Sequence, residues 1–244
     1  MGIGDEIMAL GHAQKVYKEV NRPVSIVDKN GNIRWHYIWD GAPEVTNREG
    51  YRIVNGPQAR PYIQYPFTVA KGQRFTGWKA KDHIAKLYLT PQELAFGNGL
   101  EDYVLIEPNL DPQSNQNKQW KQWQVLVDLT PDVKYLQVGP KNTRILRNVR
   151  HIETPTFRDA CGVINSVKAC VLPEGGLHHA AGALNKKAVV IFGGHISTEI
   201  TGYDCHINIG TTEPCGRWTK CFHCEQIMNN ITPEFVVEKL RSIL

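Results

Sequence analysis

The chain has 244 residues, of which 41% are hydrophobic, and its 28 Lys and Arg against 24 Asp and Glu leave a formal net charge of +4. This composition is typical of a globular protein long enough to bury a core in one large or two small domains. No apolar run approaches the roughly 18 to 20 residues that cross a bilayer, and the start lacks the basic segment and apolar core of a signal peptide. We therefore expect a cytoplasmic protein without transmembrane contact. Its mild positive charge suits a polyanionic partner but is not a nucleic-acid signature.

The first half of the chain opens on a predicted helix over residues 4–20, in the stretch GDEIMALGHAQKVYKEV, followed by a strand over 22–28. Residues 40–80 are rich in Gly, Pro, Arg and aromatic residues with no sustained period, which indicates loops and short strands. Two further helices are predicted over 79–89 and 90–96. We expect residues 1–101 to form an N-terminal domain.

The second half is more regular, because apolar strands alternate with helical patterns. Strands are predicted over 102–110, 134–139, 168–174 and 187–194, and helices over 117–129, 154–167 and 175–185. Such alternation predicts a parallel sheet with helices on both faces, here in a domain over 102–230. Residues 231–244 should form a terminal helix on the body, with Thr232 as N-cap, Pro233 at the first position, and Phe235, Val236, Leu240 and Ile243 on one face.

The strongest chemical candidate is the stretch VLPEGGLHHAAGALN, in which a strand ends at Glu174 and a helix of small residues follows Gly175 and Gly176. Glycines at such a turn let the backbone approach a ligand, and the helix start offers free amides and a positive dipole end that suit phosphate oxygens. In open α/β sheets this turn lies at the carboxyl ends of the strands, where ligands bind. An ordinary strand-to-helix turn that requires glycine is the alternative interpretation.

Several segments resemble the family-nine glycosyltransferases, which are heptosyltransferase-like enzymes. The residues Glu174 to Leu184 with the following AVVIFGG match the donor-binding core of that family, and Gly2, Gly4 and Asp5 match its first Gly-Asp helix start. The residues NKQW at Asn117 to Trp120 are similar to the Lys-x-Trp of its second domain, and the cysteine-bearing tail with its final helix also matches. Family members are commonly some 100 residues longer and place a strand before the Gly-Asp loop, so we expect the first domain to be trimmed.

This resemblance implies a GT-B-like pair of Rossmann-like domains, with a nucleoside-diphosphate sugar on the second domain and the acceptor on the first. It implies an inverting, metal-independent glycosyltransferase in which Asp5 is the general base. Lys118 would pair with the diphosphate, the amides at Gly175, Gly176 and Leu177 would stabilise the leaving group, and Glu174 would hold sugar hydroxyls. Further candidates are His179 at the donor, and Gly4 and His12 on the acceptor side.

Two other clusters leave alternatives open. Cys215, Cys221 and Cys224, with Cys205, His206 and His223 nearby in sequence, provide enough ligands for a structural zinc site or are free, packed thiols. The second cluster is a basic stripe of Lys141, Arg144, Arg147, Arg150 and His151, which would follow a phosphate backbone or form a solvated loop.

The glycosyltransferase hypothesis has two versions that differ in the acceptor. One version places a saccharide or lipopolysaccharide-like acceptor in the site, and the other a hydroxylated base in DNA, which the basic stripe favours. A nucleotide-sugar epimerase of the same architecture is an alternative enzyme, and a non-catalytic nucleotide-sugar-binding module is an alternative without catalysis.

Overall fold

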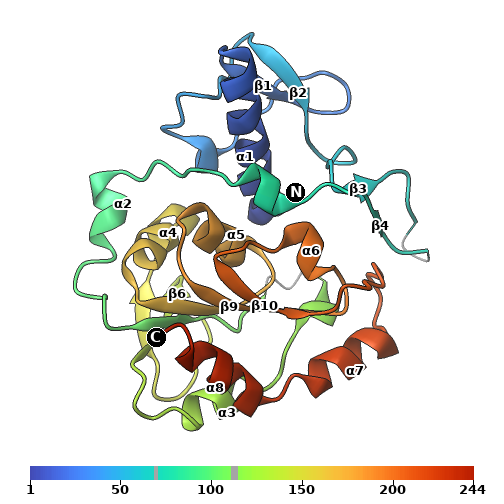
Figure 1. The fold of residues 1–244 in the computed structure, drawn as a ribbon. Coiled ribbons are helices and arrows are strands. Elements are labelled where there is room, and N and C mark those ends of the chain that lie inside the picture. Colours follow the sequence, from blue (N-terminus) through green and yellow to red (C-terminus); the bar gives the residue numbers. More distant parts are fainter. Residues whose placement is uncertain (69–70, 111–114) are drawn as a thin grey trace.

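A computed structural model describes residues 1–68, 71–110 and 115–244 as an α/β protein built on one six-stranded, all-parallel sheet (Figure 1). The strand order is β10-β9-β8-β5-β6-β7. Numbered from β5 along the chain this is the order 3-2-1-4-5-6 of a Rossmann sheet, so the order reverses between β5 and β8. The six strands are β5 (Val104–Ile106), β6 (Tyr135–Gly139), β7 (Arg150–Glu153), β8 (Ala169–Pro173), β9 (Ala188–Gly193) and β10 (His206–Gly210).

Helices cover both faces of the sheet, which explains why β5, β8 and β9 are buried along their whole length. One apolar core contains one face of the sheet with residues of α1, α4 and α5, and a second core contains the other face with residues of α3, α7 and α8. The covering helices are α3 (Trp123–Asp128), α4 (Phe157–Ser166), α5 (Gly176–Ala183), α6 (Thr198–Thr201), α7 (Phe222–Asn230) and α8 (Pro233–Arg241). The predicted sheet class is therefore confirmed.

The N-terminal unit is small and stands on one side of the sheet (Figure 1). Its long helix α1 (Ile3–Val20) is followed by two parallel strands, β1 (Val24–Val27) and β2 (Tyr51–Val54), in the register Val24 to Tyr51. An antiparallel pair then follows, made of β3 (Ile63–Gln64) and β4 (Arg74–Phe75). The remaining elements are the 3-10 turns η1 (Tyr37–Trp39) and η2 (Ala80–His83) and the helix α2 (Pro91–Ala95).

Helix α1 joins the two units, because it packs against α5 of the sheet unit. The contact is close at Gly4, where an added Cβ would lie 2.5 Å from Cδ2 of His179. A second close approach occurs at Gly11, where a Cβ would lie 1.9 Å from the backbone oxygen of His83. The apolar face of α1 therefore belongs to the same core as one face of the sheet.

Several local predictions are wrong. Residues 79–89 form only the short turn η2 and then an extended segment, in which Ala85 and Leu87 are buried while Ile84 and Lys86 are exposed. Burial at every second residue is the period of an extended chain, not of a helix. The predicted helix over 117–129 begins only at Trp123, after the 3-10 turn η3 (Gln116–Lys118). Phe235 of α8 is 41% exposed, whereas Val236 and Leu240 are buried as predicted.

The sequence pattern also predicts neither β10 nor α7. The predicted N-cap of α8 is confirmed, because the Thr232 hydroxyl accepts a hydrogen bond from the Phe235 amide. Among the residues that the structure describes, no helix combines the length and apolar character needed to cross a bilayer.

Candidate active site between the two units

The site lies at the carboxyl ends of β5 and β8, where the strand order reverses. Glu174 follows β8 directly, and Lys118 closes the turn η3 in the connection that follows β5. Their side chains form an ion pair in which only 4% of the Glu174 side chain and 18% of the Lys118 side chain are exposed. With so little water around it, the attraction between the two charges is stronger than at the surface. The crevice where the strand order reverses is also the place where α/β sheets bind ligands.

The Glu174 carboxylate has two further polar neighbours. Its Oε1 atom accepts from the Thr201 hydroxyl at 3.3 Å and lies 3.7 Å from Nε2 of His179. Burial alone would raise the pKa of this carboxyl, but the Lys118 ammonium and His179 together hold the pKa well below its usual value. Glu174 is therefore an anion that can accept hydrogen bonds from ligand hydroxyls.

Two histidines follow on α5. Nδ1 of His179 lies 2.9 Å from the Tyr203 hydroxyl, which fixes the ring between that tyrosine and Glu174. His178 is fully buried, and among the residues that the structure describes neither of its ring nitrogens has a hydrogen-bond partner. Burial is the main reason that its pKa lies well below the ordinary histidine value. His178 is therefore a neutral packing residue, while His179 borders the site.

The turn into α5 is open above its backbone. Within residues 1–68, 71–110 and 115–244, a Cβ at Gly175 would meet no atom closer than 4 Å, and no side chain caps the helix. The first amides of an α-helix have no intrahelical acceptor, so those of Gly176 and Leu177 are free to bind an anion. The Lys118–Glu174 pair thus lies next to the turn into α5, and the binding of a donor by these residues stays a prediction.

Asp5 stands on the opposite wall, in the first turn of α1. Its Oδ1 atom accepts from the Tyr62 hydroxyl, and its Oδ2 atom accepts from Nη1 of Arg60 at 3.1 Å and from the Gly2 amide at 3.1 Å. Burial and the neighbouring Asp5 carboxylate raise the pKa of Tyr62 far above its usual value, so this phenol donates its proton to Asp5. A carboxylate has about four acceptor positions, and the described residues use three of those of Asp5.

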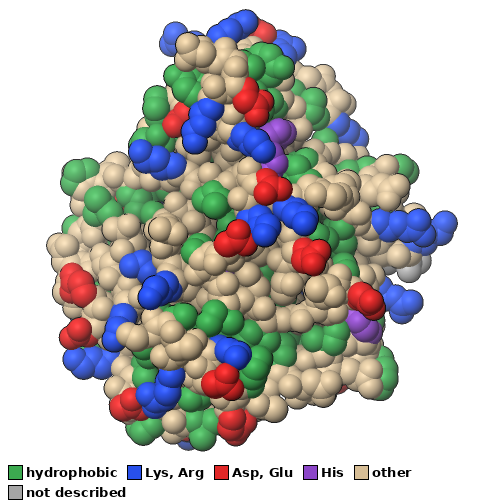
Figure 2. Space-filling view, in the orientation of Figure 1, with side chains coloured by type: hydrophobic (Ala, Val, Ile, Leu, Met, Phe, Trp, Pro, Cys, Tyr) green, Lys and Arg blue, Asp and Glu red, His purple; other side chains and the backbone are tan. Residues whose placement is uncertain are grey.

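The two walls meet directly. Gly4, next to Asp5, rests against the His179 ring, and the Glu174 carboxylate contributes to the raised pKa of Tyr62. The space-filling view shows acidic and basic side chains gathered at the seam between the N-terminal unit and the sheet unit (Figure 2). The first turn of α1, which carries Asp5, therefore packs close to the turn that carries Glu174 and His179.

Other predicted residues lie elsewhere. His12 is two turns along α1 from Asp5, with its ring centroid 5.2 Å from that of His83, and it borders the extended segment after η2. The basic stripe lies beside β6 and β7, at the sheet edge opposite β10. There Arg147 pairs with Asp128 at 3.3 Å, and Arg150 lies over the Tyr103 ring at 5.4 Å.

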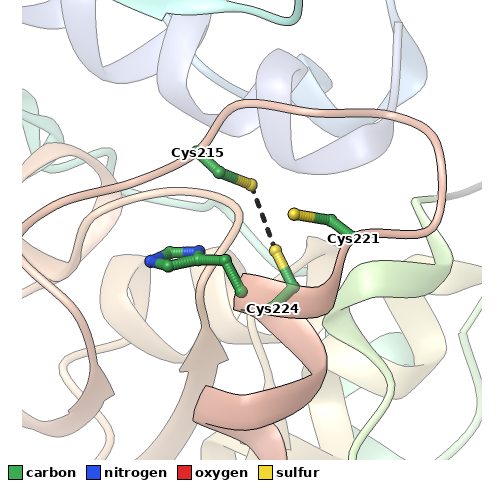
Figure 3. A group of neighbouring side chains, drawn as sticks. Cys215, Cys221 and Cys224 are labelled. Carbon is green, nitrogen blue, oxygen red and sulfur yellow. Dashed lines mark hydrogen bonds between the residues drawn. The ribbon is translucent and has the colours of Figure 1, made fainter.

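Three thiols of the C-terminal segment point toward one another (Figure 3). Sγ of Cys215 lies 3.1 Å from Sγ of Cys224, and the potential ligand atoms of Cys215, Cys221, His223 and Cys224 all lie within 4.8 Å of one another. Cys205 and His206 are not part of this group. The cluster has the residues and the spacing to hold a metal ion.

A cavity of about 520 Å³ opens between the β3–β4 pair and the segments around α6 and β10. Its walls carry the cations Lys71, Arg74 and Lys79 and the single anion Glu199. It adjoins the Asp5 wall, because Trp78 of the cavity packs on Tyr62 with ring centroids 6.0 Å apart.

Sequence reasoning misses the partners of the predicted residues. Arg60 and Tyr62 lie in the aperiodic segment 40–80, where a clustering of Arg, Tyr and Pro is the one signal that the sequence offers. Tyr203 and Thr201, which contact His179 and Glu174, follow β9 without any motif. These contacts depend on segments that meet only after folding.

No protein-family model and no curated protein matches the sequence. Among solved structures, the fold resembles that of a glycosyl transferase family 9 protein from Veillonella parvula. The TM-score is 0.63 at 10% identity, and the match covers 100% of this chain and 94% of that one. The chain therefore has the GT-B-like fold of that glycosyltransferase, which confirms the predicted fold.

Two further matches are partial. The ADP-heptose lipopolysaccharide heptosyltransferase II of E. coli matches with a TM-score of 0.49 and 21% identity, over 65% of this chain and 53% of that chain. The iron-containing dodecameric glycosyltransferase TibC of E. coli matches with a TM-score of 0.49 and 14% identity, over 65% and 48%. These two matches thus span about half of the length of the E. coli proteins.

Proposed function

We propose that the protein is an inverting glycosyltransferase that moves a sugar from a nucleoside-diphosphate sugar to an acceptor hydroxyl. The observation that carries the proposal is the convergence of Asp5 from one unit with Lys118 and Glu174 from the other. Sugar transfer needs a base for the acceptor and a cationic site for the departing diphosphate, and Asp5 and Lys118 provide groups suited to these roles from the two units. The fold shared with a family-nine glycosyltransferase supports the same proposal.

The reaction proceeds in one displacement. The free acceptor position of Asp5 takes the proton of the acceptor hydroxyl while that oxygen attacks the anomeric carbon. The bond from the anomeric carbon to the diphosphate oxygen breaks as the new bond forms, and attack from the opposite face inverts the anomeric centre. Arg60 and Tyr62 hold the Asp5 carboxylate in place through their hydrogen bonds.

The leaving group is a nucleoside diphosphate. Lys118 faces it with a positive charge, and the free amides of Gly176 and Leu177 add hydrogen bonds at the positive end of α5. Glu174 holds hydroxyls of the donor sugar, with His179 beside it. Because a lysine and helix amides balance the growing charge, the proposed reaction is metal-independent.

For the acceptor, we favour a saccharide that carries a negative group over DNA. The 520 Å³ cavity beside the Asp5 wall carries three cations against one anion, and none of the three is in an ion pair with any residue the structure describes. Arg144, Arg147 and the rest of the basic stripe lie at a sheet edge instead. A phosphate or carboxylate near the reacting hydroxyl would fit this cavity.

The cysteine cluster is a proposed structural zinc site. Three thiols and an imidazole form a Cys₃His donor set, which is a known set for tetrahedral zinc. The purified protein should contain one equivalent of zinc by mass spectrometry, and Cys224→Ser should lose it. Zinc-free protein with unchanged thermal stability would instead identify the cluster as packed thiols.

The test of the function starts with the donor. Thermal unfolding is measured with ADP, UDP, GDP, CDP and dTDP for the parent protein and for Lys118→Ala. A ligand at 100 times its dissociation constant adds about 2.7 kcal/mol of stability, which raises Tm by roughly 5 to 11 °C. A shift with one nucleotide that Lys118→Ala weakens supports the donor site, and no shift with any of them overturns it.

The acceptor and the alternatives are tested with the donor sugar so identified. Transfer to acidic saccharides that is lost in Asp5→Asn supports the proposal. Conversion of the donor sugar without any acceptor would identify an epimerase. Donor binding without turnover in the parent protein would identify a binding module, and salt-sensitive binding to hydroxylated DNA would favour the DNA acceptor.

A further inference from the structure

The turn that carries Lys118 is held by side chains rather than by a long element. It is the three-residue 3-10 turn η3, in which Asn115 is the N-cap and Asn117 directly precedes Lys118. The amide nitrogen of Asn117 donates to the carbonyls of Arg217 at 3.0 Å and Thr219 at 2.8 Å. Its amide oxygen accepts from the Cys221 backbone at 3.2 Å, so all three bonds go to residues 215–221, named here the Cys loop.

Asn115 makes a parallel contact. Its amide nitrogen donates to the Arg217 carbonyl at 2.8 Å and lies 3.0 Å from Nδ1 of His195. Both asparagines are at least nine-tenths buried. Buried amides whose hydrogen bonds end on backbone atoms fix the geometry between two segments, and their loss leaves unpaired polar groups.

The Cys loop is itself fixed at its first residues. The Cys215 and Gly216 amides donate to the carbonyls of Gly194 and His195, each at 3.0 Å, which ties the loop to the end of β9. The Gly216 carbonyl accepts from the Gln73 amide at 2.8 Å, which ties it to the N-terminal unit. The thiols bring the two ends of the loop together. Cys215 is its first residue and Cys221 its last, and Cys224 lies in the first turn of the following helix α7.

We propose that the thiol cluster and the donor lysine are energetically coupled through Asn115 and Asn117, which act as positioning residues for Lys118. A metal ion bound to the three thiols holds the two ends of the Cys loop together. The carbonyls of Arg217 and Thr219 are then at fixed positions. The hydrogen bonds of the asparagines to these carbonyls fix the position of the turn that carries Lys118. This inference rests on the proposed donor site. By linkage, metal and nucleoside diphosphate each tighten the binding of the other by the same factor.

The test compares nucleotide binding by calorimetry in zinc-loaded and chelator-treated protein under reducing conditions, with the nucleoside diphosphate that binds in the thermal panel. We expect about tenfold weaker nucleotide binding without zinc, within the usual range of such couplings. Zinc titrations with and without that nucleotide should give the same factor. Thermal unfolding of both forms verifies that the zinc-free protein is folded.

Asn117→Ala isolates the connection. It should bind one equivalent of zinc, bind the nucleotide as weakly as the zinc-free parent, and no longer respond to zinc removal. Asn230→Ala, an exposed amide at the end of α7, is the matched control and should keep the full response. If Asn117→Ala does not fold, Asn115→Ala provides the same comparison with a single bond to the loop lost.

The outcomes separate the two proposals. Nucleotide binding that is the same with and without zinc, or a protein that binds nucleotide but no zinc, overturns the coupling and leaves the glycosyltransferase proposal standing. A zinc-loaded protein that binds none of the five nucleotides overturns the donor site, and the coupling with it. A response to zinc that persists in Asn117→Ala and Asn115→Ala overturns the positioning role of the asparagines.

Discussion

The Lys118 ammonium pairs with the Glu174 carboxylate across 56 positions of sequence, at the point where the order of the parallel strands reverses. The pair brings a cation from the connection after β5 to an anion at the end of β8. Because both side chains are largely buried, the charges are arranged before any ligand arrives. A bound nucleoside diphosphate would displace Glu174 from the Lys118 ammonium. Glu174 would then compete with the diphosphate for Lys118, which would favour release of the product.

Replacing Asp5 by asparagine should abolish transfer while donor binding survives. An amide has one acceptor oxygen, so it can keep the hydrogen bond from Arg60 or the one from Tyr62 but not both. It cannot take a proton, so turnover should fall by about 10²- to 10⁴-fold. Turnover and nucleotide affinity are measured side by side. Glu19→Gln, an exposed carboxylate on the same helix, should retain full activity. Unchanged turnover in Asp5→Asn would remove Asp5 from the chemistry.

Lys118→Met should weaken nucleotide binding and destabilise the fold. Removing one partner of a buried ion pair leaves an unpaired charge and costs about 3 to 5 kcal/mol. The double variant Lys118→Met with Glu174→Gln should recover most of the free energy of unfolding, because no buried charge is left, without recovering nucleotide affinity. Denaturant unfolding and calorimetry provide the two readouts. Recovery of both properties together would show that Lys118 acts on stability alone.

Gly175→Ala should fold with nearly unchanged stability but bind nucleotide less well. The structure shows nothing within 4 Å of the added methyl group, and the backbone of Gly175 is extended, so no strain is expected. The same open space is where a diphosphate would approach the amides at the start of α5. Thermal unfolding with and without nucleotide tests both statements, and undiminished nucleotide binding would place the diphosphate elsewhere.

Glu107 should make stability depend on pH. Burial raises the pKa of this carboxyl to about 7, and its Oε2 atom has no hydrogen-bond partner in the part of the chain that the structure describes. A carboxyl with a folded-state pKa above its unfolded value binds more protons when folded, so its contribution is present at low pH and is lost as pH rises from about 4.5 to about 7. The loss amounts to about 3 kcal/mol at most.

The buried histidines have the opposite pH dependence in an overlapping range. The pKa values of His195 and His206 are lowered to about 4 by burial, so each stabilises the fold at neutral pH and loses that contribution as pH falls toward 4. The effect of Glu107 is therefore measured as the difference between the parent protein and Glu107→Gln. That difference should grow in favour of the glutamine variant between pH 5 and about 8, and a flat difference would contradict the raised pKa.

The sequence predicted the sheet unit well because its signals are local. Each of β5, β6, β8 and β9 is a short apolar run bounded by a turn, and Thr232 with Pro233 marks the start of α8. The same locality failed where tertiary contacts decide the conformation. Residues 84–89 have apolar residues that a helix could use, yet they lie extended along α1, where Lys86 donates its backbone amide to the side chain of Gln14 at 2.7 Å.

The candidate site divides in the same way. Glu174, Gly175 and Gly176 could be found from sequence, because a strand, a glycine turn and a helix of small residues follow one another within a few positions. The partners of Asp5 could not, because Arg60 and Tyr62 lie 55 and 57 residues away in an aperiodic segment.

By itself, the sequence determined the parallel sheet, its glycine turn and the grouping of three cysteines, all of which depend on neighbouring residues. Only the tertiary structure decided that Lys118 pairs with Glu174, that Arg60 and Tyr62 bind the Asp5 carboxylate, and that Asn117 bonds to the carbonyls of Arg217 and Thr219. Each of these relationships joins segments that the chain separates and that packing alone brings within reach of a hydrogen bond or an ion pair.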